Sequence, residues 1–272
     1  MKLVVFLKQV PAVTEIPWDP ASGRLRREKA PGMMNPACRH ALEAALILKE
    51  QHGGELTAIS MGPPAAEEIL REALALGADR AVLLSDARLA GADTPATSYT
   101  LSLAVRAVCP DCDLLLLGNQ TSDSETGQVG PHLAEELDLP SAINVEELKL
   151  EGGVLRVKRL CDNFLETLEM DLPALVTINT QGHPPRQVPL GGVEDAFSRG
   201  EFLVLDAEDL KADLARVGMA GSAGRIVKVY PAGGERRGEL IKGAPKRCVL
   251  ELLERHGDRL GGYLRKDLGG ER

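Results

Sequence analysis

Short apolar runs alternate with amphipathic segments over the first two thirds of the chain, and this alternation restricts the fold more than any other feature. The runs have the length of buried strands and cover residues 2–7, 55–60, 80–84, 113–117 and 174–178. Helical spacing of apolar residues predicts helices between them, over 36–52, 67–76, 93–108 and 131–139. Strands separated by single helices form parallel βαβ units with right-handed crossovers. We therefore predict an α/β fold with a doubly wound, mostly parallel, Rossmann-like sheet.

The pattern after residue 140 is typical of antiparallel pairing instead. Residues 145–150 and 154–160 flank Gly152-Gly153, which predicts a small antiparallel hairpin element, and residues 165–170 have the pattern of a third strand. Short helices are expected at 193–197, 206–214 and 245–253, and a further small hairpin at 16–27.

The stretch 118–132 joins a predicted strand to a predicted helix and has the composition of an anion-binding turn. In an open parallel sheet such a turn lies at the carboxyl end of a strand, where ligands bind, and the first amides of the next helix have no internal partners. Gly127 and Gly130 lack a Cβ, so an anion can come close to the backbone, and Ser124 and Thr126 add hydroxyl donors.

Two carboxylates in this stretch argue against a phosphate site. Asp123 and Glu125 would repel a polyphosphate unless they point outward, meet a cation or accept from ribose hydroxyls. The alternative interpretation is an ordinary helix cap with a glycine that eases the turn. The composition of the stretch is therefore compatible with both.

Composition excludes several classes of partner. The chain of 272 residues has a net charge of −8 and only 3% aromatic residues, so we expect no nucleic-acid partner. No apolar run has membrane-spanning length, and the apolar start is too short for a signal peptide. Five cysteines, an odd number and mostly isolated, fit a reducing compartment, and we expect the cytoplasm.

The sequence contains no recognisable set of catalytic residues. Neither the Gly-x-Gly-x-x-Gly fingerprint nor a P-loop is present, no histidines have metal-ligand spacing, and no serine or cysteine stands in a nucleophile motif. Cys109-Pro-Asp-Cys112 has the spacing of a redox pair or half a zinc site, but no second pair accompanies it. A packing role is the favoured interpretation of these cysteines. Binding is thus a better first hypothesis than bond-making, and whether the chain is itself an enzyme stays open.

Several short motifs, in this order and spacing, resemble the β subunit of electron-transfer flavoprotein over nearly the whole chain. They are Lys8-Gln-Val10, Met34-Asn-Pro36, Ser60-Met-Gly-Pro63, Ala73-Leu-Ala-Leu-Gly-Ala-Asp79, Leu117-Gly-Asn-Gln120, Thr126-Gly-Gln128 and Pro185-Arg186. The resemblance implies an electron-carrier subunit that pairs with an α subunit and buries an adenine nucleotide near the 118–132 stretch.

The resemblance also implies the residues that hold the nucleotide. Gln9 and Val10 would lie near it, Asn35 and Pro36 near the adenine, and Met61 beside the adenine. The set around sugar and phosphates is Asn119, Gln120, Asp123, Thr126, Gly127, Gln128, Val129 and Gly130.

The residues favour FAD over AMP as the nucleotide of this subunit. The segments 90–100 and 128–131 resemble the branch of the family that holds a second FAD in β and can bifurcate electrons. Asp93, Thr94 and Thr97 mark a second helix start, so a pyrophosphate could meet two helix N-termini whereas a monophosphate needs one. Thr121-Ser122 and Glu125-Thr126-Gly127 depart from the usual loop of that branch, and AMP is the alternative.

The resemblance also implies contacts with protein partners. Leu190, in a loop with three prolines, would anchor an acyl-CoA or other dehydrogenase, although Glu194 and Asp195 replace basic residues common in simple members of the family. Residues 1–200 are expected to form the nucleotide-binding domain. Residues 201–272, which include the glycine-rich stretch 218–243, are expected to form a C-terminal arm that packs on the partner subunit.

Two other classes stay open at this point. A stand-alone nucleotide-binding protein of the stress-protein type would form a homodimer and would not need the arm. An ATP-consuming ligase would need a basic phosphate clamp, but residues 118–132 contain no Lys or Arg.

Overall fold

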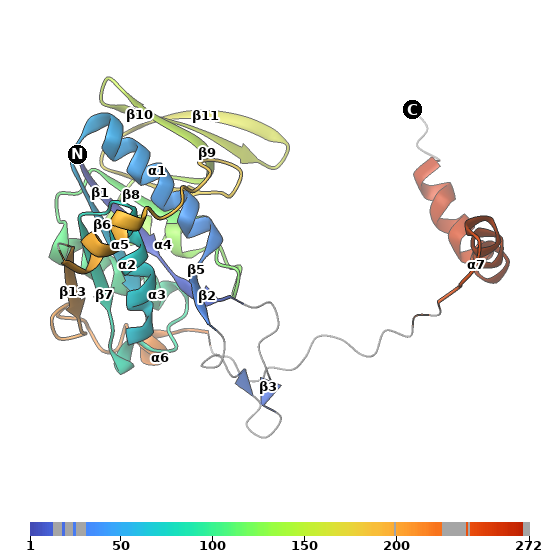
Figure 1. Cartoon of the computed structure of the whole chain (residues 1–272), viewed down its shortest axis with the longest axis horizontal. Helices are drawn as coiled ribbons and strands as arrows, with labels where there is room; N and C mark the ends of the chain where they lie inside the picture. The colour runs from blue at the N-terminus through green and yellow to red at the C-terminus, as the bar shows by residue number, and fades with distance from the viewer. Residues whose placement is uncertain are drawn as a thin grey trace. The chain divides into compact units, whose positions relative to one another are not determined.

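The computed structural model describes residues 1–12, 18–19, 24–25, 31–198, 200–224, 238 and 240–268 (Figure 1). It consists of two compact units, Met1–Val229 and Tyr230–Arg272. The first unit holds the sheet and most helices. The second holds helix α7, Pro245–Leu268.

The core of the first unit is a nine-stranded sheet in the order β11-β10-β9-β12-β8-β1-β6-β7-β13. Every neighbouring pair from β9 to β13 is parallel, which confirms the predicted doubly wound sheet. The bounds of these strands are β1 Lys2–Leu7, β6 Glu55–Met61, β7 Arg80–Leu84, β8 Leu114–Gly118, β9 Ser141–Glu151, β12 Ala174–Ile178 and β13 Glu201–Leu205.

The predicted antiparallel element is also present. Strands β10, Val154–Cys161, and β11, Phe164–Asp171, continue the sheet from β9 as antiparallel neighbours, and Figure 1 shows them at the top of the core. Two short antiparallel pairs are also present among the described residues. They are β2, Gln9–Pro11, with β5, Gly32–Met34, and β3, Trp18–Asp19, with β4, Arg24–Leu25; the rest of the hairpin predicted at 16–27 lies outside the described residues.

Helices cover both faces of the sheet because alternate residues of the buried strands point to opposite sides. Leu3 and Val5 pack with α1, Pro36–His52, and α2, Glu67–Leu76. Val4 and Phe6 pack on the other face with α3, Thr94–Val108, and α4, Val129–Leu137. Helix α5, Leu190–Ser198, lies beside α2, and short turns η2, Pro64–Ala66, and η3, Ala87–Leu89, precede α2 and α3.

The prediction of a helix over 206–214 is wrong. Residues 201–205 form β13, which pairs with β7 at the edge of the sheet, and consecutive turns follow it. The Asp206 carboxylate accepts from the amides of Glu208 and Asp209 at 2.8 and 2.9 Å, and Lys211 has a φ of 52°. Aspartate bonded to its own backbone favours turns over helix, and a left-handed residue ends any helical run.

The division of the chain also differs from the expected boundary after residue 200. Strand β13 belongs to the core sheet, and α6, Gly218–Gly221, lies against η3, where the Met219 amide donates to the Ala90 carbonyl at 3.0 Å. The compact first unit therefore extends beyond the start of the predicted arm. In the described part of the chain no helix has the length and apolarity needed to cross a bilayer.

Gly118 at the end of β8 allows close packing of α1, and this predicts a sensitive position. An added Cβ would lie 2.7 Å from the Ala37 carbonyl carbon and 2.8 Å from the Cys38 nitrogen, both backbone atoms. Gly118→Ala should lower the free energy of unfolding by about 1–3 kcal/mol in chemical denaturation, as overpacking does. Gly191→Ala is the control, because nothing lies within 4 Å of its added Cβ. Equal stability of the two variants would contradict this packing.

Candidate functional site

The candidate site lies at the carboxyl edge of the sheet, where strand order reverses. Strand β1 pairs with β6 on one side and with β8 on the other. The crossover through α1 leads toward β6, and the crossover through α3 returns to β8, so the loops after β1 and β8 diverge at this point. Ligands of doubly wound sheets bind in this kind of crevice.

Asn35 ties the two diverging loops together. It is 1% exposed and precedes α1, but its side chain does not cap the helix. Its Nδ2 donates to the Gln120 carbonyl at 2.9 Å, and its Oδ1 accepts from the Ser122 amide at 3.0 Å. The family resemblance implies that Asn35 lies near the adenine, and in the structure its side-chain amide fixes the loop after β8.

An ion pair joins the same two loops a second time. Lys8 Nζ lies 2.8 and 3.0 Å from the two carboxylate oxygens of Asp123. Asp123 thus meets a cation, which is one of the outcomes that would reconcile it with a phosphate site. Burial raises the pKa of Asp123, but the hydrogen bond and charge of Lys8 outweigh burial, and the pKa lies below its ordinary value.

The loop after β8 ends at the start of α4, and its last residues are exposed. Thr126, Gly127 and Gln128 are exposed, and Gly127 has a φ of 63°, a conformation that favours glycine. No described side chain caps the α4 N-terminus. Its first amides therefore remain available to an anion.

Gly130 also has a packing role. It is buried, and an added Cβ would lie 2.4 Å from Cγ2 of Thr177 in β12. Its missing side chain therefore lets α4 pack on the sheet, and a ligand at the helix start would meet its backbone amide. Val129, beside it, is half-buried and packs against the core on the α3 side of the sheet.

The starts of α3 and α4 lie side by side, as the pyrophosphate hypothesis requires. Thr94 Oγ1 donates to Gln128 Oε1 at 3.1 Å, and Ser98 Oγ donates to the Val129 carbonyl at 3.1 Å. The two starts are not equivalent, however. The Asp93 carboxylate accepts from the amides of Ala96 and Gly224 at 3.1 and 3.0 Å, so a negative charge already caps α3.

Thr97 and Asp93 complete this region. Burial raises the pKa of Asp93, but the backbone donors Gly224 and Ala96 more than compensate, and the pKa is lowered. Thr97 is half-buried in the first turn of α3. Of the two helix starts, α4 is consequently the better anion site.

The remaining predicted residues extend along the edge on both sides of β1. Val10 is 1% exposed, so its side chain belongs to the core. Gln9 Nε2 donates to the Ala65 carbonyl at 3.2 Å and so lies toward α2. Half-buried Met61 ends β6 and packs against the core on the α3 side of the sheet. Asn119 donates to Asn144 at 3.1 Å, toward β9, while Pro36 is exposed at the start of α1.

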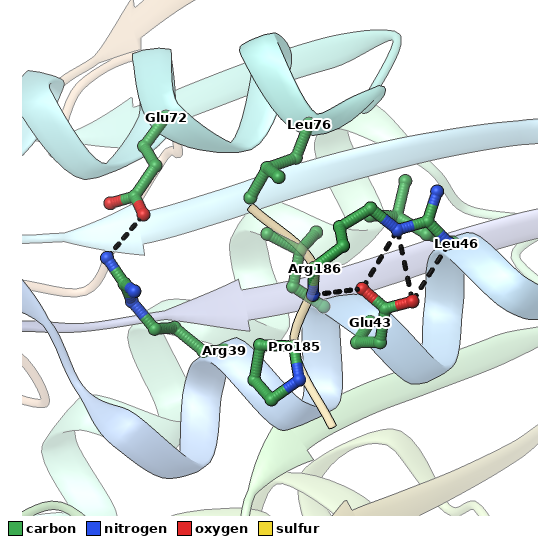
Figure 2. Close-up of a pocket in the computed structure, with 8 residues that line it drawn as sticks. Arg39, Glu43, Leu46, Glu72, Leu76, Pro185 and Arg186 are labelled. Carbon is green, nitrogen blue, oxygen red and sulfur yellow. Dashed lines mark hydrogen bonds and ion pairs between the residues drawn. The ribbon is translucent and has the colours of Figure 1, made fainter. Parts of the chain in front are cut away.

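Leu190 lies in a separate region, after a loop that a buried carboxylate holds through Arg186. Figure 2 shows this carboxylate, Glu43, beside Arg186. Glu43 of α1 is 6% exposed and accepts from Arg186 Nη2 at 2.8 Å, Nε at 2.9 Å and the backbone amide at 3.0 Å. Arg186 also pairs with Glu50, whose pKa is lowered mainly by this hydrogen bond. Four residues later, Leu190 is 94% exposed at the first position of α5.

The hollow in Figure 2 is too small to be a ligand site. Its volume is about 10 Å³, enough for a single water, and Arg39 and Arg186 in its lining are paired with Glu72 and Glu43. The described residues contain no cluster of three or more His, Cys, Asp or Glu side chains that could hold a metal ion. The carboxyl edge with α4 therefore remains the candidate site.

Comparison with known proteins identifies the family. Residues 23–209 match the electron transfer flavoprotein domain family. The chain is 40% identical over 259 residues to the electron transfer flavoprotein subunit beta of Thermoanaerobacterium thermosaccharolyticum, with 95% of this chain and 99% of that protein covered. The chain belongs to the electron-transfer flavoprotein β-subunit family.

Two further relatives are similar over most of their length. The electron transfer flavoprotein subunit beta of Clostridium acetobutylicum is 38% identical, with 94% of this chain and 99% of that protein covered. The caffeyl-CoA reductase-Etf complex subunit CarD of Acetobacterium woodii is also 38% identical with the same coverage. The resemblance to the electron-transfer flavoprotein β subunit that the short sequence motifs indicated is thereby confirmed.

Sequence reasoning missed Lys8 as a site residue. The lysine follows β1 directly and belongs to one of the quoted motifs, which was an available signal. Its partner Asp123 is 115 residues away in the sequence, so no local sequence pattern indicates that the two residues pair.

The Lys8–Asp123 pair predicts a pH-dependent contribution to stability. Because the folded pKa of Asp123 is lowered, the contribution is present above the ordinary aspartate pKa of about 3.9 and is lost as pH falls through the folded value. The difference in unfolding free energy between the natural protein and Asp123→Asn should be largest near neutral pH and shrink below about pH 4.

Urea denaturation between neutral and acidic pH measures this difference. In the Lys8→Met background, Asp123→Asn should produce a smaller difference that varies less with pH. A difference that stays constant across the range in the natural background would contradict the pairing.

Proposed function

We propose that this protein is the β subunit of a heterodimeric electron-transfer flavoprotein that binds an adenine nucleotide at the carboxyl edge of its sheet, with FAD favoured over AMP. The observation that carries the proposal is the uncapped, glycine-preceded start of α4 beside the strand-order reversal between β1 and β8. A flavin bound there would supply one- and two-electron redox chemistry for the transfer of electrons between partner proteins.

Several groups would hold the nucleotide in this proposal. The amides from Gly127 to Gly130 would meet phosphate, and the loop carrying Asn119 and Gln120 would border the sugar. The side of the edge with Met61, Gln9 and Pro36 would border the adenine. Asn35, Lys8 and Asp123 would act by fixing the loop, since their polar atoms already bond one another or its backbone.

The assignment of FAD rests on the adjacent starts of α3 and α4, which Thr94 and Gln128 join. Because the Asp93 carboxylate already caps the α3 start, an anion would bind more favourably at the α4 start. The α4 start alone would suit a monophosphate equally well. The caffeyl-CoA reductase relative bears a name that links it to a reductase complex, in line with passage of electrons between dehydrogenases or reductases and other acceptors. The proposal that this subunit binds FAD includes electron bifurcation, in which an electron pair is divided between two acceptors.

Cofactor analysis of the heterodimer, purified after expression with its α subunit, tests the nucleotide assignment. Acid extraction and chromatography should give two FAD per heterodimer, because each subunit would hold one. One FAD with one AMP would overturn the assignment of FAD to this subunit while leaving the family membership intact.

We also propose that Leu190 is the anchor for an acyl-CoA or other dehydrogenase. Its side chain is almost fully exposed, and the Glu43–Arg186 pair fixes the preceding loop on α1. An exposed leucine on a pre-ordered loop loses little conformational entropy when it enters a partner's pocket.

Leu190→Ala should weaken the apparent affinity for the dehydrogenase by about tenfold, the effect of losing roughly 1.4 kcal/mol at an interface hot spot. Steady-state reduction of the heterodimer at varied concentration measures this affinity. Flavin content and thermal stability should not change. Leu214→Ala, at a leucine that is 50% exposed elsewhere on the unit, is the matched control. The same loss for both variants, or none for Leu190→Ala, would contradict the proposal.

The α subunit is proposed to cover two apolar surfaces. The hairpin β10–β11 exposes Leu160, Phe164 and Leu165 at 44%, 73% and 64%. Helix α7 exposes Val249, Leu250 and Leu253 at 54%, 54% and 47%. Exposed apolar groups of this kind mark protein interfaces.

The protein is also proposed to be located in the cytoplasm, because all five of its cysteines are free thiols.

Removal of residues 225–272 should reduce the yield of heterodimer in size-exclusion chromatography. This truncation keeps Ser222 and Gly224, which contact Asp93, so the core keeps its own contacts. Circular dichroism of the truncated chain checks that the sheet remains folded. Full recovery of heterodimer from the truncated chain would show that the arm does not hold the partner.

A further inference from the structure

Cys109 and Cys112 close the connection between α3 and β8 at the amino edge of the sheet, opposite the candidate nucleotide site. The Cys112 amide donates to the Cys109 carbonyl at 3.2 Å, so the two residues are the ends of a tight turn. Such a turn brings its end Cα atoms within about 7 Å, and disulfides span about 4.4–6.8 Å between Cα atoms. Both thiols are free and buried in the same apolar cluster. The backbone therefore already suits a disulfide.

The two thiols differ in their access to small molecules. Cys109 lines a cavity of about 80 Å³ together with Lys2, Thr57 and Arg80, whereas Cys112 is not part of its lining. This volume has room for a water or a molecule of hydrogen peroxide. Arg80 Nε is buried in the same lining, 3.7 Å from a Glu55 carboxylate oxygen, and has no hydrogen-bond partner among the described residues.

We propose that Cys109 and Cys112 form a reversible redox site in which a small peroxide oxidises the dithiol to a disulfide. The Cys109 sulfur attacks one peroxide oxygen, the O–O bond breaks, and the departing oxygen takes a proton and leaves as water. Cys109 is then a sulfenic acid. The Cys112 sulfur attacks the Cys109 sulfur, the S–S bond forms and the S–O bond breaks. The second oxygen leaves as water with the Cys112 proton, so the dithiol loses two electrons and the peroxide gains them.

The surroundings of Cys109 favour its role as the attacking thiol. The hydrogen bond from Cys112 and, to a smaller extent, the Lys2 ammonium lower the pKa of Cys109, although burial, Asp111 and Glu55 oppose them. The same hydrogen bond and burial raise the pKa of Cys112. The end of α3 disfavours a thiolate through the helix dipole, so these neighbours provide the compensation.

Peptide mapping of the full-length protein tests the proposal. A modest excess of hydrogen peroxide, followed by alkylation of remaining thiols under denaturing conditions, should yield a Cys109–Cys112 disulfide before Cys38, Cys161 or Cys248 is modified. Dithiothreitol should restore both thiols. Oxidation of the half-buried Cys161 or Cys248 with Cys109 and Cys112 left reduced would overturn the proposal without any variant.

Three variants separate the roles of the groups. Cys112→Ser should leave a sulfenic acid on Cys109 that dimedone traps, whereas Cys109→Ser should leave Cys112 largely unreacted. Lys2→Gln should raise the pKa of Cys109 and thereby slow its attack on peroxide, by about threefold for each pKa unit. The loss of thiolate is about tenfold per unit, but a thiolate of higher pKa is a stronger nucleophile and recovers part of the rate. Lys2→Arg is the matched control and should keep the rate. Equal trapping on either single cysteine variant would contradict the assigned order.

Discussion

The pairing of β1 on both sides sets the position of everything that we assign to function. Because β1 is hydrogen-bonded to β8 and to β6, the chain must leave it in one direction and return on the other side. The two connections cannot lie over each other at the carboxyl edge, and they leave a crevice between them. Buried aliphatic side chains on both faces of β1 make any other register costly, since a slip would exchange the side chains that face α1 and α3.

Helix α1 connects this crevice to the loop that precedes Leu190. At its start, Asn35 holds the loop after β8 through two hydrogen bonds. Two turns later, Glu43 holds the loop after β12 through Arg186. Both loops contain few apolar residues of their own, so their order comes from polar groups on a helix that is itself fixed by the core. Gly118 permits the close approach of α1 to β8 that this arrangement needs.

The sequence predicted the buried parallel elements well, because residues with both faces buried leave long apolar runs. The bounds of α2, β7 and β12 agree with those predicted at 67–76, 80–84 and 174–178. Edge strand β13 was missed because its apolar run lies in the segment 201–272 that was expected to form the arm, and the turns after Asp206 resemble a helix in the spacing of their apolar residues. The predicted loop after β8 is where the structure has it, but its ties to Asn35 and Lys8 join residues 85 to 115 positions apart and leave no local pattern.

The two ion pairs that order the functional loops have different physical consequences. In the Lys8–Asp123 pair the lysine side chain is 41% exposed, so water screens the charges and the pair selects a loop conformation more than it adds stability. The Glu43 carboxylate side chain is only 8% exposed, and removal of Arg186 would leave a buried charge without compensation, at a cost of about 3–5 kcal/mol. The loop that precedes Leu190 is thereby bound to the folded core itself. The loop after β8 is bound more loosely, because its ion pair lies partly in water and its charges are screened.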